Sequence, residues 1–132
     1  MKIICIGNSG DKLSAKHYEA GAYNRSSTFD LSLKREYTVY GISLWRGLLA
    51  YLTIGDGQRP YWYPSDLFEV ADPRLPADWY FAFFDQKDET WLNAIWGYKE
   101  IMDAKHYDQL ADLERPALEI FEMRRREIDS SS

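Results

Sequence analysis

Residues 37–71, YTVYGISLWRGLLAYLTIGDGQRPYWYPSDLFEVA, decide the fold, because strand-like segments alternate in them with short turns. β-Branched and aromatic residues dominate the segments, which is typical of strands. Arg46-Gly47 indicates a bend, and Gly55-Asp56-Gly57-Gln58 predicts a tight hairpin in which Asp-Gly adopts positive φ. Pro64-Ser65-Asp66 predicts a single tight turn. We therefore expect antiparallel strands at 36–42, 48–54, 60–63 and 67–71.

The sequence before and after this segment predicts an opening strand, one further strand pair and three helices. Residues 1–28 indicate a strand at 2–6, a loop and a short helix from Ser14 to Ala22. Residues 77–129 indicate a hairpin and two helices, the first of them capped by Asp103. The expected elements are strands at 79–84 and 92–99, helices at 103–110 and 113–128, and a frayed tail at 129–132. We therefore expect a single α+β domain over residues 1–132, with residues 36–71 as its core.

The charge distribution separates the two ends of the chain. The net charge of the 132 residues is −5, with 21 acidic and 16 basic side chains. Residues 77–132 alone carry a net charge of −6, and residues 1–28 carry +2. Phosphate binding needs a cationic surface, so the composition argues against DNA or RNA as the ligand. A basic protein partner is the expectation that remains, with solubility as the alternative reason for the acidic residues.

The cysteine count and the apolar runs indicate the compartment. Cys5 is the only cysteine, so no internal disulfide can form, and its place in an apolar strand predicts a buried thiol. No apolar run approaches the roughly 20 residues of a membrane helix, and MKIICIGNSG indicates an opening strand rather than a signal peptide. We therefore expect a cytoplasmic protein with no membrane contact.

The sequence contains no recognisable catalytic or metal-binding motif. Gly7 and Gly10 are three residues apart, and Asp11 stands where a phosphate-binding loop needs glycine and lysine. His17 and His106 lack further ligands at metal-binding spacing, so we interpret both as solvated or helix-surface residues. Paired carboxylates such as Asp108 and Asp112 lie on expected helix surfaces or in turns. We therefore expect no enzymatic activity, no cofactor and no metal.

Two resemblances add to this interpretation. Residues 63–70, YPSDLFEV, are similar to the closing pattern of the Src-homology-3 fold, in which Pro-Ser and a short turn precede the last strand of the barrel. The aromatic opening motif of that signalling module is absent, and no acidic loop follows the first strand, so the resemblance extends to the fold and not to the ligand. It implies a small antiparallel Src-homology-3-like barrel extended by a further hairpin, with C-terminal helices.

The whole chain resembles a group of small, stand-alone bacterial proteins of unassigned activity. The resemblance rests on residues 1–10 (MKIICIGNSG), 37–45 (YTVYGISLW), 60–70 (PYWYPSDLFEV), 96–100 (WGYKE) and the helix ALEIF…RRREID. Small acidic proteins of this type are similar to the immunity partners of bacterial toxins, which implies protein binding rather than catalysis.

Aromatic residues near the strand turns are the candidate binding surface. Trp62 faces the opposite way from Tyr61 and Tyr63 in an extended strand, and exposed rings often anchor protein interfaces. The alternative is that the rings join the strands to the C-terminal helices. The predicted partner-binding residues are Trp45, Trp62, Asp85, Asp88, Glu89, Trp91, Asp103, Asp108 and Asp112. We expect a toxin-binding immunity or antitoxin protein, in which the carboxylates steer a cationic partner, or alternatively a small regulatory domain that binds a peptide or small molecule.

Overall fold

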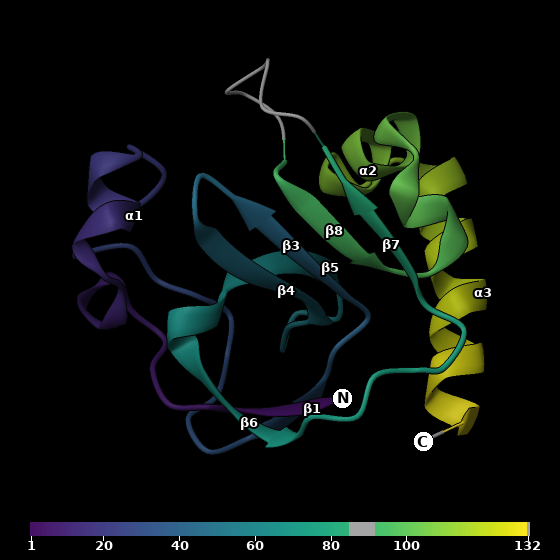
Figure 1. Cartoon of the computed structure of the whole chain (residues 1–132). Helices are drawn as coiled ribbons and strands as arrows, with labels where there is room; N and C mark the ends of the chain where they lie inside the picture. The colour runs from purple at the N-terminus through teal and green to yellow at the C-terminus, as the bar shows by residue number, and fades with distance from the viewer. Residues whose placement is uncertain (85–91, 132) are drawn as a thin grey trace.

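The computed structural model describes residues 1–84 and 92–131 and has an α+β fold. Figure 1 shows the strands in the centre, α2 and α3 together on one side, and α1 on the opposite side. The strands are β1 (Lys2–Cys5), β2 (Glu36–Thr38), β3 (Gly41–Trp45), β4 (Leu48–Ile54), β5 (Pro60–Pro64), β6 (Phe68–Asp72), β7 (Tyr80–Phe83) and β8 (Ala94–Gly97). The helices are α1 (Ala15–Glu19), α2 (Ala104–Ala111) and α3 (Arg115–Ser131), with short 3₁₀ turns η1 (Gly10–Lys12), η2 (Ser65–Leu67) and η3 (Lys99–Met102).

The strand pairs within residues 1–84 and 92–131 are all antiparallel and form two sheets. The smaller sheet has the order β2-β1-β6, and the larger has the order β5-β4-β3-β8-β7. The predicted hairpins β3-β4 and β4-β5 are confirmed, with Tyr51 opposite Tyr63 in the second. The pairing of β7 with β8 confirms the further hairpin, and α2 and α3 confirm the C-terminal helices.

The expected single strand at 36–42 is divided between two strands, β2 and β3, because the chain changes sheets within it. The Val39 N–H donates to the carbonyl of Met1 (3.0 Å), and the Tyr40 N–H donates to the carbonyl of Leu52 (2.8 Å). Residues before this point therefore pair with β1, whereas β3 pairs with β4 and continues to Trp45. Arg46 and Gly47 make the predicted bend, both with positive φ. In the next hairpin Gln58, rather than Asp-Gly, adopts positive φ.

The helix ends also differ from the sequence expectation. The first helix stops at Glu19 rather than Ala22. The expected fraying is wrong for residues 129–131, because α3 continues to Ser131, and residue 132 lies outside the described residues. Asp129 accepts a hydrogen bond from the Tyr40 hydroxyl (2.7 Å), and this contact ties the last turn of α3 to the sheet. Within residues 1–84 and 92–131, no helix is long and apolar enough to cross a lipid bilayer.

Two hydrophobic clusters form the core, one on each face of β4. Tyr51 belongs to the cluster with Ile3, Cys5 and Leu67, which joins the smaller sheet to the larger one. Leu52 belongs to the second cluster, in which Phe121 and other residues of the C-terminal helices pack against the larger sheet. Both faces of β4 are thus buried, and Cys5 is a buried free thiol, as predicted.

Candidate functional site

An aromatic cleft of about 360 Å³ lies between the N-terminal segment, the larger sheet and α2. The structure brings three of the predicted partner-binding residues together here: Trp45, Trp62 and Asp108. The residues that line it are His17, Ala22, Tyr23, Ser43, Trp45, Leu48, Leu49, Ala50, Trp62, Pro64, Leu92, Tyr107 and Asp108. We call this site the aromatic cleft.

Alternation along β5 places Trp62 on the side of the C-terminal helices. Tyr61 and Tyr63 share the other face, with ring centroids 4.9 Å apart, as the sequence predicts. The ring of Trp62 packs 5.3 Å from that of Tyr107 on α2. Burial raises the pKa of Tyr107 to about 12, and a hydrogen bond with Ser43 partly opposes that shift. Nε1 of Trp62 is buried and has no hydrogen-bond partner in the described part of the chain.

The N-terminal wall of the aromatic cleft is held in place by Asp66 on η2. Its carboxylate accepts a hydrogen bond from the backbone N–H of Ser14 (2.7 Å) and lies 3.4 Å from Nε2 of His17. These contacts fix the start of α1 against the turn that follows β5. The interpretation of His17 as a solvated residue is wrong, because its side chain is only 4% exposed and forms part of this wall.

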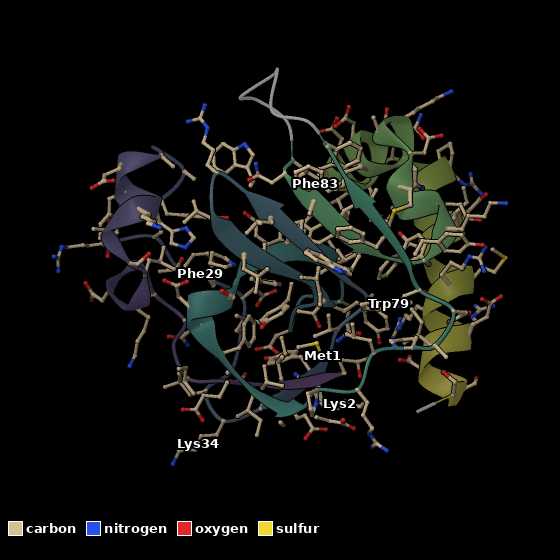
Figure 2. The ribbon with its side chains drawn as sticks, in the orientation of Figure 1. Met1, Lys2, Phe29, Lys34, Trp79 and Phe83 are labelled. Atoms are coloured by element: carbon tan, nitrogen blue, oxygen red, sulfur yellow. The ribbon has the colours of Figure 1, made fainter. Side chains whose placement is uncertain are left out.

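Tyr23 forms the next part of the wall and is held by aromatic neighbours. Its hydroxyl lies 2.8 Å from that of Tyr61, and its ring meets the edge of Phe29 at 5.1 Å (Figure 2 labels Phe29). Burial and the Tyr61 hydroxyl raise the pKa of Tyr23 well above its usual range. Tyr23 therefore stays neutral at physiological pH and offers the aromatic cleft a ring and a hydroxyl group.

Charges of opposite sign stand at the two sides of the aromatic cleft. The Arg46 guanidinium lies 4.9 Å from the centroid of the Trp45 ring, and Lys16 Nζ lies beside the β3-β4 turn. Asp108 stands on the other side, on the exposed surface of α2. The face of Trp45 thus already holds a cation, and Asp108 supplies a carboxylate across the opening.

The remaining predicted site residues lie elsewhere. Asp103 is the N-cap of α2, as predicted, where its carboxylate accepts a hydrogen bond from the Lys105 N–H (2.8 Å). Asp112 is exposed at the other end of α2. Neither residue lines the aromatic cleft. The other four predicted residues, Asp85, Asp88, Glu89 and Trp91, lie outside the described residues.

His106 holds α2 in position from within the core. The interpretation of His106 as a solvated residue is wrong, because it is 6% exposed and its Nε2 lies 2.7 Å from the Tyr98 hydroxyl. The helical period explains the burial: His106 and Leu110 are four residues apart and face the same side of α2. Burial lowers the pKa of His106, while Glu100 and Asp103 act in the opposite direction.

We predict that His106 makes stability fall with acidification below about pH 6.5. Above that pH the imidazole is neutral in both states. Below it, the unfolded chain binds a proton that folded His106, with its lowered pKa, resists. The free energy of unfolding therefore falls, by at most about 1.4 kcal/mol one pH unit below the unfolded-state pKa. Urea unfolding across this range measures the effect; His106→Gln should flatten the slope, and an equal slope in both proteins would contradict the assignment.

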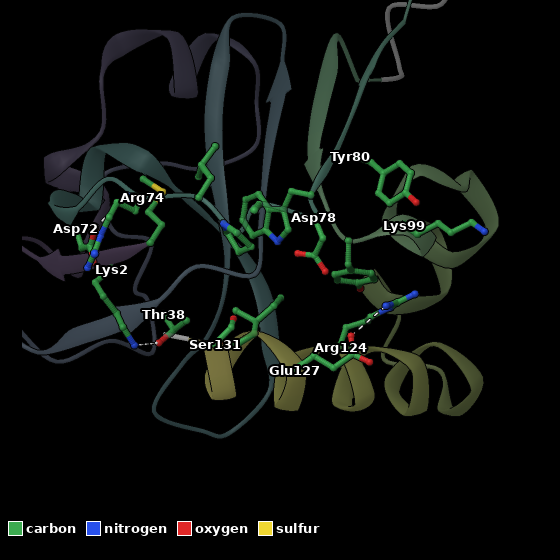
Figure 3. A pocket seen from close by; sticks show the side chains of 17 residues that line it. Lys2, Thr38, Asp72, Arg74, Asp78, Tyr80, Lys99, Arg124, Glu127 and Ser131 are labelled. Atoms are coloured by element: carbon green, nitrogen blue, oxygen red, sulfur yellow. Dashed lines mark hydrogen bonds and ion pairs between the residues drawn. The ribbon is translucent and has the colours of Figure 1, made fainter.

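A larger cavity of about 640 Å³ lies between β1, residues 72–80 and the end of α3 (Figure 3). Most of its charged side chains are engaged with one another or with nearby groups. Arg74 pairs with Asp72 at 2.7 Å, and Lys2 donates to the Thr38 hydroxyl at 2.6 Å. Arg124 pairs with Glu100 at 2.7 Å and with Glu127 at 3.1 Å. Because none of the predicted site residues lines this cavity, the aromatic cleft is the better candidate.

Sequence reasoning missed Tyr23 and Tyr107, although both line the aromatic cleft. Tyr107 could have been found, because it is an aromatic residue directly before the predicted site residue Asp108 on the expected helix. Tyr23 stands in a polar loop with no periodic pattern, and only the tertiary contact with Phe29 brings it to the site.

In residues 1–84 and 92–131, no group of three or more His, Cys, Asp or Glu side chains is arranged to hold a metal ion. No protein-family model, curated protein or solved structure matches the chain. The geometry of the aromatic cleft is therefore the main indication of function.

Proposed function

We propose that the chain is a non-enzymatic binding protein whose aromatic cleft receives a basic segment of a partner protein. The observation that carries the proposal is the convergence of Tyr23, Trp45, Trp62 and Tyr107 on one open cleft with Asp108 at its rim. These four rings come from four separate parts of the chain. Tryptophan and tyrosine are the side chains that most often dominate interface energies when a partner covers them.

Three features of the aromatic cleft favour a cationic side chain. The Trp45 ring already contacts the Arg46 guanidinium, so its face suits a cation, and a lysine or arginine of the partner would take the place of Arg46 there. Asp108 provides a counter-charge at the opening. The net charge of −6 over residues 77–132 attracts a basic partner over a longer range.

A bacterial toxin is the partner class that this proposal favours. An acidic immunity protein neutralises its toxin by binding tightly, and it needs no catalytic group. The reducing cytoplasm is the proposed compartment, because Cys5 is a free, buried thiol. Coexpression with a basic toxin domain encoded by a neighbouring gene should restore growth, and Trp45→Ala should abolish the rescue.

We also infer that β1 to β6 form a Src-homology-3-type barrel beneath the aromatic cleft. Support comes from the pairing of β1 with both β2 and β6, the passage of the chain between sheets at Val39–Tyr40, and the η2 turn before β6. Such a barrel gives the rings of the cleft a rigid floor.

We predict that Asp108 and Trp45 control binding of basic peptides. Titration of the protein with a lysine- and arginine-rich peptide should change its tryptophan fluorescence, because Trp45 and Trp62 line the cleft. Trp45→Ala should weaken binding about 30-fold or more, as expected for an aromatic anchor. Asp108→Lys should weaken it about 10-fold or more, because the introduced cation repels the peptide at the rim.

Asp112→Lys is the matched control, since it makes the same charge change one helical turn further along α2 and outside the aromatic cleft. It should weaken binding less than about 3-fold, through long-range electrostatics alone. Equal losses for Asp108→Lys and Asp112→Lys, or no binding of basic peptides by the wild-type protein, would overturn the proposed site.

The second candidate function is binding of a small molecule in the same cleft. Its volume of about 360 Å³ favours this alternative, because it falls within the usual range for ligand pockets. Saturable fluorescence quenching by a neutral low-molecular-weight compound, with no response to basic peptides, would select this function over the first.

A further inference from the structure

The edge strand β7 exposes an unusual amount of aromatic surface. Tyr80 is 51% exposed, Phe81 is 57% exposed and Phe83 is 70% exposed (Figure 2 labels Phe83). In the described part of the chain, β7 is the outer strand of the larger sheet and pairs only with β8. Contiguous exposed rings on an edge strand usually mark a contact surface.

The backbone of β7 presents hydrogen-bonding groups to this open edge. The N–H of Phe84 donates to the carbonyl of Asn93 (2.8 Å), directly beyond the register pair Phe83–Ala94. In an antiparallel pair the hydrogen-bonded residues alternate, so Ala82 also bonds toward β8. The N–H and C=O groups of Phe81 and Phe83 therefore point away from β8, toward the edge.

The other sheet edges of the described chain are blocked by charge or proline. β5 begins with Pro60 and ends with Pro64, and proline lacks the N–H that a further strand needs. β2 carries Glu36, and β6 carries Glu69 and Asp72. Residues 80–84, YFAFF, contain neither charge nor proline. Among these edges, β7 alone lacks the usual protection against strand pairing.

We propose that β7 pairs with β7 of a second copy of this chain, antiparallel and about a two-fold axis at Ala82. The outward groups of Phe81 would then exchange hydrogen bonds with those of Phe83 in the second copy. Each Phe81 ring would lie beside a Phe83 ring, and such cross-strand aromatic pairs stabilise sheets. The two larger sheets would join into one continuous sheet.

A second copy of the chain matches the uncharged edge of β7 better than the basic partner proposed for the aromatic cleft. Residues 80–84 offer no carboxylate to a cation, whereas two uncharged strands meet without repulsion. The strand is identical in both copies, so the contact is complementary to itself, as a two-fold interface requires. The inference does not depend on the proposed function, because β7 contributes no residue to the aromatic cleft.

The exposed area predicts a weak and reversible dimer. A fully exposed aromatic side chain has a surface of roughly 200 Å². Covering the exposed fractions of Tyr80, Phe81 and Phe83 in both copies therefore removes roughly 700 Å² from solvent. Stable interfaces start at about 1,200 Å², so the dimer should depend on concentration. We expect a dissociation constant between about 1 μM and about 1 mM.

Sedimentation equilibrium over this concentration range tests the proposal on the intact protein. The wild-type chain should show a monomer–dimer equilibrium. Phe83→Lys should weaken the dimer at least about 10-fold, because two cations enter the interface without partners. Val70→Lys is the matched control, since Val70 is a 48% exposed residue on the edge strand β6. It should leave the dimer unchanged.

Mixing two variants tests the register. Phe81→Lys and Phe83→Glu should each weaken self-association, but their mixture should form a heterodimer in which the introduced lysine faces the introduced glutamate. A mixture of Phe83→Lys with Phe83→Glu should not recover in this way, because these positions do not face each other. Thermal unfolding confirms that each variant is folded. A wild-type protein that stays monomeric, or a dimer that Phe83→Lys leaves intact, overturns the proposal.

Discussion

Replacement of Phe121 by alanine is expected to lower the free energy of unfolding by about 3–5 kcal/mol. Phe121 lies on α3, is 2% exposed, and packs edge-on against Tyr40 (5.5 Å) and at 6.4 Å from Tyr98. Alanine loses the buried ring and leaves a cavity between α3 and the larger sheet. Because small domains have a total stability of about 5–15 kcal/mol, this single change removes a large share of it.

Urea unfolding followed by tryptophan fluorescence measures the effect of Phe121→Ala. Met123→Ala is the matched control, since Met123 stands on the same helix but is 47% exposed. It should change the free energy of unfolding by less than about 0.5 kcal/mol. A loss below about 1 kcal/mol for Phe121→Ala would mean that α3 contributes little to the second hydrophobic cluster.

The predictable part of the fold is the part that local chemistry determines. The bend at Arg46-Gly47 follows from a glycine in a two-residue turn, and the start of α2 follows from Asp103 as N-cap. The break at Val39–Tyr40 was not predictable from periodicity. Both residues have strand-forming side chains, and only their separate hydrogen bonds to Met1 and Leu52 divide the strand between two sheets.

The candidate site was predictable to the extent that its residues carry a local signal. Trp45 and Trp62 stood out as rings beside turns, and both line the aromatic cleft. His17 and His106 were misinterpreted because a polar residue on a short helix suggests solvent exposure. Their burial depends on partners outside their own helices, Asp66 for His17 and Tyr98 for His106. Asp108 lines the aromatic cleft and Asp112 does not. Only the structure distinguishes the two residues, because their spacing along the helix does not show which of them faces the cleft.

The second large effect is expected at Gly10, where the backbone of the N-terminal segment makes its closest approach. A Cβ atom at this position would overlap the carbonyl oxygen of Asn24 and stand 2.8 Å from the carbonyl carbon. The Gly10 N–H also donates to the carbonyl of Ser27 (2.8 Å), and its carbonyl accepts from the Tyr18 hydroxyl (2.5 Å). Gly10→Ala must therefore displace backbone that is hydrogen-bonded on both sides. We expect a loss of about 3 kcal/mol or more in the free energy of unfolding.

Gly21→Ala is the control that distinguishes the steric overlap at Gly10 from the cost of placing alanine at a positive φ. Gly21 has a φ of +75°, but a Cβ there would meet no described atom within 4 Å, so the expected cost is only about 1 kcal/mol. Gly10→Ala should in addition weaken binding of a basic peptide, because the displaced residues 24–27 directly follow Tyr23 in the wall of the aromatic cleft. Urea unfolding and the fluorescence titration measure the two effects on the same samples. Equal losses of stability in the two variants would contradict the packing argument. Unchanged peptide binding by folded Gly10→Ala would mean that the N-terminal wall does not contribute to the aromatic cleft.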